Sequence, residues 1–201
     1  GFVRCAHQME HKGIFIHSKV EIDFHAPDVG MHRKLTLISA PAGFGKTTLV
    51  SAWINARRIP TAWFSVSQED NDPGRFWSYI IAALQTISAD TGVDSLAMLR
   101  ASPPVPVEPF LTSLLNEIEK IRTPFVLVLD DFHCIENRPI QEGVQFLVEH
   151  LPLEGHVFLS TRADPPWSLA RLRTRAEMVE LRIEDLRFTL EETTAFLNSV
   201  M

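Results

Sequence analysis

Two kinds of apolar segment follow one another along this chain: short continuous apolar runs, and stretches in which apolar residues have helical spacing. Between the runs, apolar residues recur every three or four positions, which predicts amphipathic helices. Five runs bounded by turn residues predict strands near residues 35–39, 61–66, 125–130, 156–161 and 177–181. Strands that alternate with helices indicate parallel βαβ units. The pattern therefore predicts an α/β fold, with a five-stranded, mostly parallel sheet and helices on both of its faces.

Capping residues mark the start of two helices. In "NDPGRFWSYIIAAL", Asp72 is expected to cap a helix whose first residue is Pro73. In "TLEETTAFL", Thr189 and Glu192 form the capping box of a helix that starts close to the end of the chain, so we expect a domain cut from a longer protein. The expected parts are a lead-in over residues 1–34 with a strand over 14–24, an α/β domain over 35–188, and the start of a further helical region over 189–201.

Composition and charge exclude several classes of protein. The 201 residues are 45% hydrophobic and 22% charged, as in an ordinary soluble globular domain. The formal net charge of −6 argues against a chain that itself binds nucleic acid, although another part of a longer protein is free to do so. Two cysteines provide no disulfide framework, which indicates a reducing cytoplasm. No run approaches the roughly 18 apolar residues of a membrane helix, so we expect no membrane association.

The first strand runs into "LTLISAPAGFGKTT", which resembles the phosphate-binding P-loop pattern G-x-x-x-x-G-K-[ST]. Ala40 occupies the first glycine position, where a methyl group is tolerable if the backbone needs no positive φ. Lys46 is expected to contact the β- and γ-phosphates, and the Thr47 hydroxyl is expected to hold Mg²⁺. The alternative, a flexible turn, does not explain the apolar strand before the loop and the periodic helix after it. The expected phosphate cradle consists of Ala42, Gly43, Phe44, Gly45, Lys46, Thr47 and Thr48.

The most hydrophobic strand, "FVLVLDD", ends in two carboxylates. A carboxylate at the tip of a buried strand beside the P-loop strand is placed to hold Mg²⁺, and we assign this role to Asp130. Asp131 is the candidate for orienting or deprotonating the attacking water. The alternative is that the two aspartates only begin a turn. At the end of the next strand, Arg162 is placed to sense the γ-phosphate, and a purely solvated arginine is the alternative.

Other patterns in the chain receive no catalytic role. "HQMEH", His7 to His11, matches a metalloprotease pattern, but no periodic helix surrounds it. His133 and Cys134 are chain neighbours, which alone does not make a nucleophile–base pair. A basic cluster without interleaved aromatic residues, which indicates a solvated face or an interdomain contact, consists of Arg171, Arg173 and Arg175.

Four stretches, in this order, resemble the ATPase domain of MalT-type transcription activators of the LuxR family: "LISAPAGFGKTTLVSAW", "NDPGRFWSYIIAAL", "VLVLDDFHCI" and "STRADPPWSLARLRTR". These bacterial regulators belong to the STAND class of P-loop ATPases, and the resemblance covers about residues 35–200. By position, it implies that Gly43–Thr48 form the family's P-loop. It also implies that Asp130–Asp131 form the acidic strand end and that Arg162 is the sensor arginine. ATP or ADP with Mg²⁺ are the implied ligands.

The resemblance implies a slowly hydrolysing switch rather than a metabolic enzyme. In such regulators, the ADP-bound form is a resting monomer, and ATP with an inducer permits self-association. A winged-helix region, an inducer-binding helical-repeat region and a C-terminal helix-turn-helix follow the ATPase domain, so DNA binding is expected only through parts outside this chain. Residues 1–34 do not match the family's lead-in, and adenine contacts therefore stay unassigned.

Two competing hypotheses come from other classes. A P-loop kinase or other nucleotide-dependent transferase requires an acceptor site and an arginine-rich lid, for which "RLRTR" is the candidate. A catalytically inactive nucleotide-binding scaffold would keep nucleotide affinity without hydrolysis.

Overall fold

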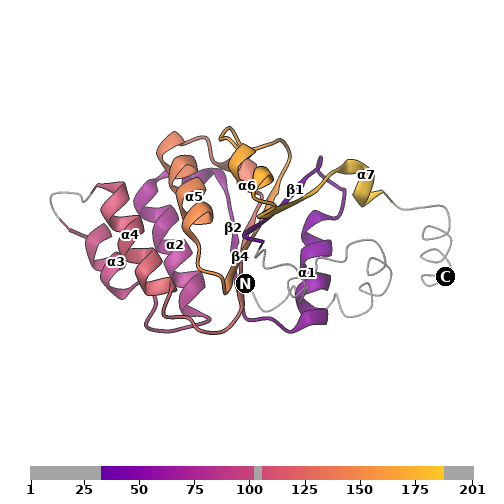
Figure 1. Ribbon diagram of the computed structural model, residues 1–201. Coiled ribbons are helices and arrows are strands. Elements are labelled where there is room, and N and C mark those ends of the chain that lie inside the picture. The colour runs from indigo at the N-terminus through magenta and orange to yellow at the C-terminus, as the bar shows by residue number, and fades with distance from the viewer. Residues whose placement is uncertain (1–32, 102–105, 188–201) are drawn as a thin grey trace.

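The computed structural model describes residues 33–101 and 106–187 of the chain, and these form a parallel sheet with helices around it (Figure 1). The strands are β1 (Leu35–Ser39), β2 (Thr61–Ser65), β3 (Phe125–Asp130), β4 (Gly155–Thr161) and β5 (Met178–Leu181). Each predicted strand of the sheet overlaps its observed counterpart, and the α/β class with five parallel strands is confirmed. The predicted strand over 14–24, the "HQMEH" stretch and the helix at Thr189 lie outside the described residues.

Helices cover both faces of the sheet, as predicted. They are α1 (Lys46–Arg57), α2 (Pro73–Gln85), α3 (Val93–Leu99), α4 (Val107–Ile118), α5 (Arg138–His150), α6 (Ala170–Thr174) and α7 (Ile183–Leu186), with short 3₁₀ helices η2 (Gln68–Asn71) and η3 (Phe132–Cys134). Figure 1 shows α1 on one side of the sheet and α2, α4 and α5 on the other. None of these helices of the described part is long and apolar enough to cross a bilayer.

Strand β3 shows how one sheet serves two cores. Leu127 packs in the core beneath α2, α4 and α5, whereas its neighbours Val126 and Val128 pack in the core beneath α1. Side chains alternate between the faces of a strand, so both of these residue sets are buried only if helices cover both faces. All six residues of β3 are buried, which explains why its sequence is a continuous apolar run.

The strand order differs from the expectation at one point. The acidic strand β3 does not lie beside the P-loop strand β1, because the order is β2-β3-β4-β1-β5 and β4 pairs with both of them. The crossover from β1 to β2 passes over two positions that β3 and β4 fill later in the chain. The carboxyl ends of β1, β4 and β3 therefore lie next to one another, at the edge where open α/β sheets bind ligands.

Helix α2 begins where its sequence predicts, and α3 does not have an equivalent signal. The Asp72 side chain accepts a hydrogen bond of 2.8 Å from the backbone N–H of Arg75, and Pro73 is the first helical residue. The start of α3 is instead held by the buried Glu117 of α4, which accepts from the backbone N–H and the hydroxyl of Ser95. A carboxylate from another helix is not visible in the local sequence of α3.

His156, on β4, is buried and joins β4 to the start of β1. Its Nδ1 lies 2.8 Å from the carbonyl oxygen of Arg33, and its Nε2 lies 2.9 Å from the Thr36 hydroxyl. A carbonyl oxygen only accepts, so Nδ1 carries the proton and Nε2 accepts from Thr36. Burial lowers the pKa of His156 from 6.5 to about 4. The folded protein therefore holds a neutral imidazole at neutral pH.

We expect His156 to make the protein less stable as the pH falls from 6.5 toward 4. The unfolded chain takes up the imidazole proton near pH 6.5 and the folded chain only near pH 4, so the unfolded state binds more protons between these values. The free energy of unfolding should fall by ~3 kcal/mol through this group. Denaturant unfolding across this pH range measures the loss, which His156→Gln should reduce and His150→Gln, at an exposed histidine, should not. An undiminished loss in His156→Gln would contradict the assignment.

Candidate functional site

The loop between β1 and α1, the predicted phosphate cradle, is built around two glycines with positive φ. Gly43 and Gly45 have φ values of +86° and +75°, in the left-handed region that favours glycine. A Cβ added at either glycine would have no other atom within 4 Å, so open space lies beside this backbone. Among the described residues, Ala40 does not have a positive φ, so its buried methyl group causes no backbone strain at the first glycine position of the motif.

Helix α1 starts directly from this loop. Gly45 is its N-cap, and no side chain caps the N–H groups of its first turn. The first N–H groups of a helix have no partner within the helix, and together with the helix dipole they favour an anion. The start of this twelve-residue helix is therefore suited to bind a phosphate group.

The Lys46 side chain is buried in the same loop, with 7% of the residue exposed. Its Nζ donates to two carbonyl oxygens of the loop at 2.8 and 3.0 Å. Burial lowers the pKa of Lys46 against the opposing charge of Asp131, while Arg162 lowers this pKa further and Asp130 raises it. These four charged groups therefore share one electrostatic environment.

Thr47 and Asp130, which are 83 positions apart in the chain, meet at the carboxyl edge of the sheet. The Thr47 hydroxyl donates to Oδ2 of Asp130 at 2.9 Å, and Oδ1 of the same carboxylate accepts from the Ser160 hydroxyl. Ser160 is fully buried on β4, the strand that separates β1 from β3. The Asp130 carboxylate is thus held between a hydroxyl of α1 and a hydroxyl of β4.

The chemistry of this contact fits Mg²⁺. Mg²⁺ prefers oxygen ligands and in nucleotide sites is held by one or two protein oxygens together with phosphates and water. The Thr47 hydroxyl and the Asp130 carboxylate are such oxygens, and they lie next to a loop with open space beside its glycines. These residues fit a metal that is bound together with a nucleotide.

Asp131 has different surroundings from its neighbour. It follows β3 directly and adopts φ +58°, a left-handed conformation that aspartate tolerates better than most residues. Its side chain is 48% exposed, and Oδ1 lies 3.7 Å from Nδ1 of His133. Two hydroxyls hold the Asp130 carboxylate, whereas the half-exposed Asp131 carboxylate lies near His133. The assignment of Asp130 to the metal and Asp131 to the attacking water stays a prediction.

Arg162 lies where the sequence analysis expects it, immediately after the last residue of β4. It is exposed, and its positive charge contributes to lowering the pKa of both Lys46 and His133. An arginine at this position faces the same edge of the sheet as the P-loop. The predicted role of Arg162 toward a γ-phosphate is consistent with this position and stays a prediction.

The side chains of His133 and Cys134 are in contact, but their pKa shifts do not favour a nucleophile–base pair. Burial lowers the pKa of His133, with a further contribution from Arg162. Burial also raises the pKa of the Cys134 thiol, which opposes thiolate formation. The Sγ and Nε2 atoms are 3.9 Å apart. That these two residues carry no nucleophilic chemistry stays a prediction.

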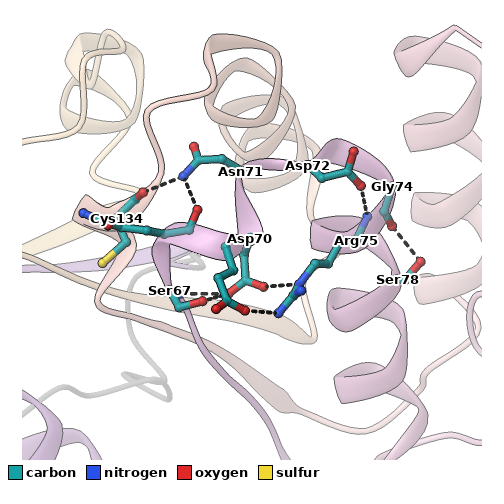
Figure 2. A network of polar contacts seen from close by, with 10 residues as sticks. Ser67, Asp70, Asn71, Asp72, Gly74, Arg75, Ser78 and Cys134 are labelled. Carbon is teal, nitrogen blue, oxygen red and sulfur yellow. Dashed lines mark hydrogen bonds and ion pairs between the residues drawn. The ribbon is translucent and has the colours of Figure 1, made fainter.

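A polar network that the sequence analysis does not find holds the loop after β3. The Asn71 carboxamide donates to the Cys134 carbonyl at 2.9 Å and accepts from the backbone N–H groups of Glu136 and Asn137 at 2.8 and 2.9 Å. Figure 2 shows Asn71 reaching from η2 toward Cys134. Its side chain therefore ties the loop after β2 to the loop that begins at Asp131.

The turn that carries Asn71 is itself fixed by charge-assisted hydrogen bonds (Figure 2). The buried Asp70 carboxylate accepts from the backbone N–H and the hydroxyl of Ser67 at 2.8 and 2.7 Å, and from Nε of Arg75 at 2.9 Å. The hydrogen bonds from Ser67 and Arg75 lower the pKa of Asp70 against the opposing effect of burial, so its carboxylate stays charged. This turn gives Asn71 a rigid support.

The basic cluster near α6 forms ion pairs at the surface. Arg171 lies 2.9 Å from Glu149, and Arg173 lies 2.5 Å from Glu180. Arg175 is exposed. The structure agrees with the prediction of a solvated face for this cluster.

The structure brings the predicted site residues to one edge of the sheet. The loop residues 42–48 follow β1, the two aspartates follow β3 and Arg162 follows β4. Ala42 is exposed, and Phe44 and Thr48 are half-buried beside the cradle. Sequence reasoning missed Ser160, although a polar residue at the end of the buried run "VFLSTR" was a usable signal. The chemical roles of all these residues stay predictions.

The fold and this site define the class of P-loop NTPases. Over 165 residues, or 82% of its length, the chain is 37% identical to the HTH-type transcriptional regulator MalT of Serratia proteamaculans. Over the same extent it is 33% identical to the regulator of that name from Yersinia enterocolitica and 32% identical to that from Vibrio cholerae. The resemblance to MalT-type transcription regulators is therefore confirmed. The chain spans 18% of the length of each of these relatives.

Other comparisons add little. No protein-family model matches the chain. The crystal structure of Cdc6p from Pyrobaculum aerophilum matches 96% of this chain and 48% of its own, with 16% identity and a TM-score of 0.48. The Aeropyrum pernix ORC1 protein in complex with DNA matches 83% of this chain and 43% of its own, with 17% identity and a TM-score of 0.45. With TM-scores this low, no functional conclusion follows from either structure.

Proposed function

We propose that this chain is the nucleotide-dependent switch module of a signal-responsive bacterial transcription regulator. It binds ATP or ADP with Mg²⁺ and hydrolyses ATP slowly in the cytoplasm. In the whole protein, the ATP state promotes self-association, and a part outside this chain binds DNA. In this proposal residues 35–188 form the ATPase unit.

The contact between Thr47 and Asp130 carries this proposal. A P-loop hydroxyl and a strand-end carboxylate from a distant part of the sequence lie 2.9 Å apart. In P-loop NTPases these two groups hold the same metal ion. The sequence similarity to MalT regulators supports a regulatory rather than a metabolic context.

The residues of the site divide the work of phosphoryl transfer to water. The backbone of Gly43–Thr48 and the Lys46 ammonium bind and orient the phosphates. The Thr47 hydroxyl and the Asp130 carboxylate would hold Mg²⁺, which when bound neutralises charge on the β- and γ-phosphates. Asp131 accepts a hydrogen bond from the attacking water and takes its proton. Arg162 stabilises the negative charge that develops on the transferred group.

The exposure of two of these residues supports slow hydrolysis. Asp131 has a half-exposed side chain, and Arg162 is exposed. Charged groups stabilise a transition state best where water is excluded, because the local dielectric is then low. A site whose water-orienting group and arginine both face solvent is expected to turn over slowly until another surface covers it.

Calorimetric titration of the chain with ATP and ADP, with and without Mg²⁺, tests the proposal. We expect saturable binding of both nucleotides and slow phosphate release with water as the only acceptor. No saturable binding up to about 1 mM nucleotide would overturn it, since this limit corresponds to about −4 kcal/mol of binding free energy. Phosphoryl transfer that requires an added acceptor would favour a kinase. Binding without any hydrolysis, also in the whole protein, would favour an inactive scaffold.

A further inference from the structure

The Ser160 hydroxyl is used in two directions at once. It donates to Oδ1 of Asp130, and its Oγ accepts from the backbone N–H of Asp131 at 3.0 Å. A serine has one O–H donor and two acceptor lone pairs, so both contacts are compatible. Ser160 is fully buried on β4, which is fixed by pairing with β3 on one side and β1 on the other. Its hydroxyl therefore has a well-defined position relative to both aspartates.

The first contact decides where the Asp130 carboxylate points. The torsion that rotates a carboxylate has broad preferences, so a single hydrogen bond leaves its second oxygen free to turn. Here Ser160 holds Oδ1, and Oδ2 is directed to the Thr47 hydroxyl at 2.9 Å. Ser160 thus orients the oxygen that faces the P-loop helix.

The second contact decides where the next side chain goes. Asp131 adopts a left-handed backbone at φ +58°, which aspartate tolerates better than most residues but which still gains from a supporting contact. The hydrogen bond from its N–H to Ser160 supports this conformation. The turn separates two adjacent carboxylates, one buried against two hydroxyls and one half exposed.

We propose that Ser160 is a positioning residue that gives the two neighbouring aspartates different jobs. It turns Asp130 toward Thr47 for metal binding and directs Asp131 to the side where the attacking water is bound. This inference rests on the proposed nucleotide-dependent function and deepens it, because it names the residue that orients the two carboxylates.

Two variants at Ser160 and one at its neighbour test whether Ser160 orients Asp130 for metal binding. Ser160→Ala removes the hydroxyl, and Ser160→Thr keeps it on a residue type that suits strands. Thr161→Val is the matched control, since the buried Thr161 hydroxyl donates to the Ala163 carbonyl rather than to a carboxylate. In Ser160→Ala we expect the Mg²⁺ concentration for half-maximal promotion of nucleotide binding to rise about tenfold or more. Binding in EDTA should keep the wild-type Kd, and Ser160→Thr should restore the wild-type Mg²⁺ dependence.

Hydrogen exchange of the nucleotide-free protein tests whether Ser160 supports the backbone of Asp131. The Asp131 amide should exchange about tenfold faster or more in Ser160→Ala, while Ser160→Thr and Thr161→Val keep the wild-type rate. This measurement tests the contact between Ser160 and the Asp131 backbone even if the wild-type protein binds no nucleotide. Absence of nucleotide binding would overturn only the proposed function. If Ser160→Ala does not fold, Ser160→Cys, which keeps most of the volume but bonds weakly, replaces it in both measurements. Wild-type Mg²⁺ dependence or wild-type Asp131 exchange in the hydroxyl-free variant overturns the inference.

Discussion

Lys46→Ala is expected to lower the affinity for ATP and for ADP by about 100-fold or more, because truncating a buried charged partner of a ligand typically costs several kcal/mol. The Lys46 ammonium is held in the loop by two carbonyl oxygens at 2.8 and 3.0 Å. It is thus positioned before a ligand arrives, and little side-chain entropy is lost on binding. Calorimetry with both nucleotides measures the change.

The stability of Lys46→Ala should not follow its affinity. Burial lowers the pKa of Lys46, which means that the fold disfavours its charge relative to the unfolded chain. Removing this charge is therefore expected to leave Tm unchanged or to raise it. Lys34→Ala is the matched control, because the Lys34 Nζ also donates to a backbone carbonyl, that of Glu149. Lys34 lies at the amino end of β1, whereas the P-loop follows its carboxyl end. Equal nucleotide affinity of the Lys46 and Lys34 variants would contradict the cradle.

Local signals explain which parts of the fold the sequence predicts. Strand β3 is a continuous apolar run because both of its faces are covered, and a pattern of this kind needs no knowledge of the partners. Asp72 and Pro73 mark the start of α2 because a cap and the first helical residue act on adjacent backbone groups. The glycines at 43 and 45 are predictable for the same reason, since their positive φ values are local.

Non-local contacts explain which parts it does not predict. The connection from β1 to β2 leaves two strand positions between them, and β3 and β4 later fill these positions. The position of β4 between β1 and β3 therefore depends on the topology of the whole sheet. Ser160 acquires its role only from that order, because a strand elsewhere in the sheet would not bring its hydroxyl to Asp130. The Asn71 and Glu117 contacts likewise join segments that lie far apart in the sequence. The candidate residues were therefore predictable from motifs, and their supports were not.

Asp131→Asn is expected to reduce ATP hydrolysis by about 100-fold or more, because a positioned general base contributes this much to proton transfer. Nucleotide affinity should stay at the wild-type value or rise, since the substitution removes a negative charge near the phosphates. Asp130→Asn should instead weaken the Mg²⁺ dependence of binding, because the Asp130 carboxylate contacts Thr47. Single-turnover hydrolysis and binding at several Mg²⁺ concentrations separate the two effects.

Glu136→Gln, at an exposed residue of the same loop, is the control for a general loss of acidic charge and should keep wild-type hydrolysis. Exchanged phenotypes, with metal dependence lost in Asp131→Asn and only hydrolysis lost in Asp130→Asn, would contradict the division between the two carboxylates. A variant that binds ATP and does not hydrolyse it remains in the ATP state. In the whole regulator, Asp131→Asn should therefore self-associate with ATP for longer than wild type, whereas Asp130→Asn should not, and light scattering after a single addition of ATP distinguishes them.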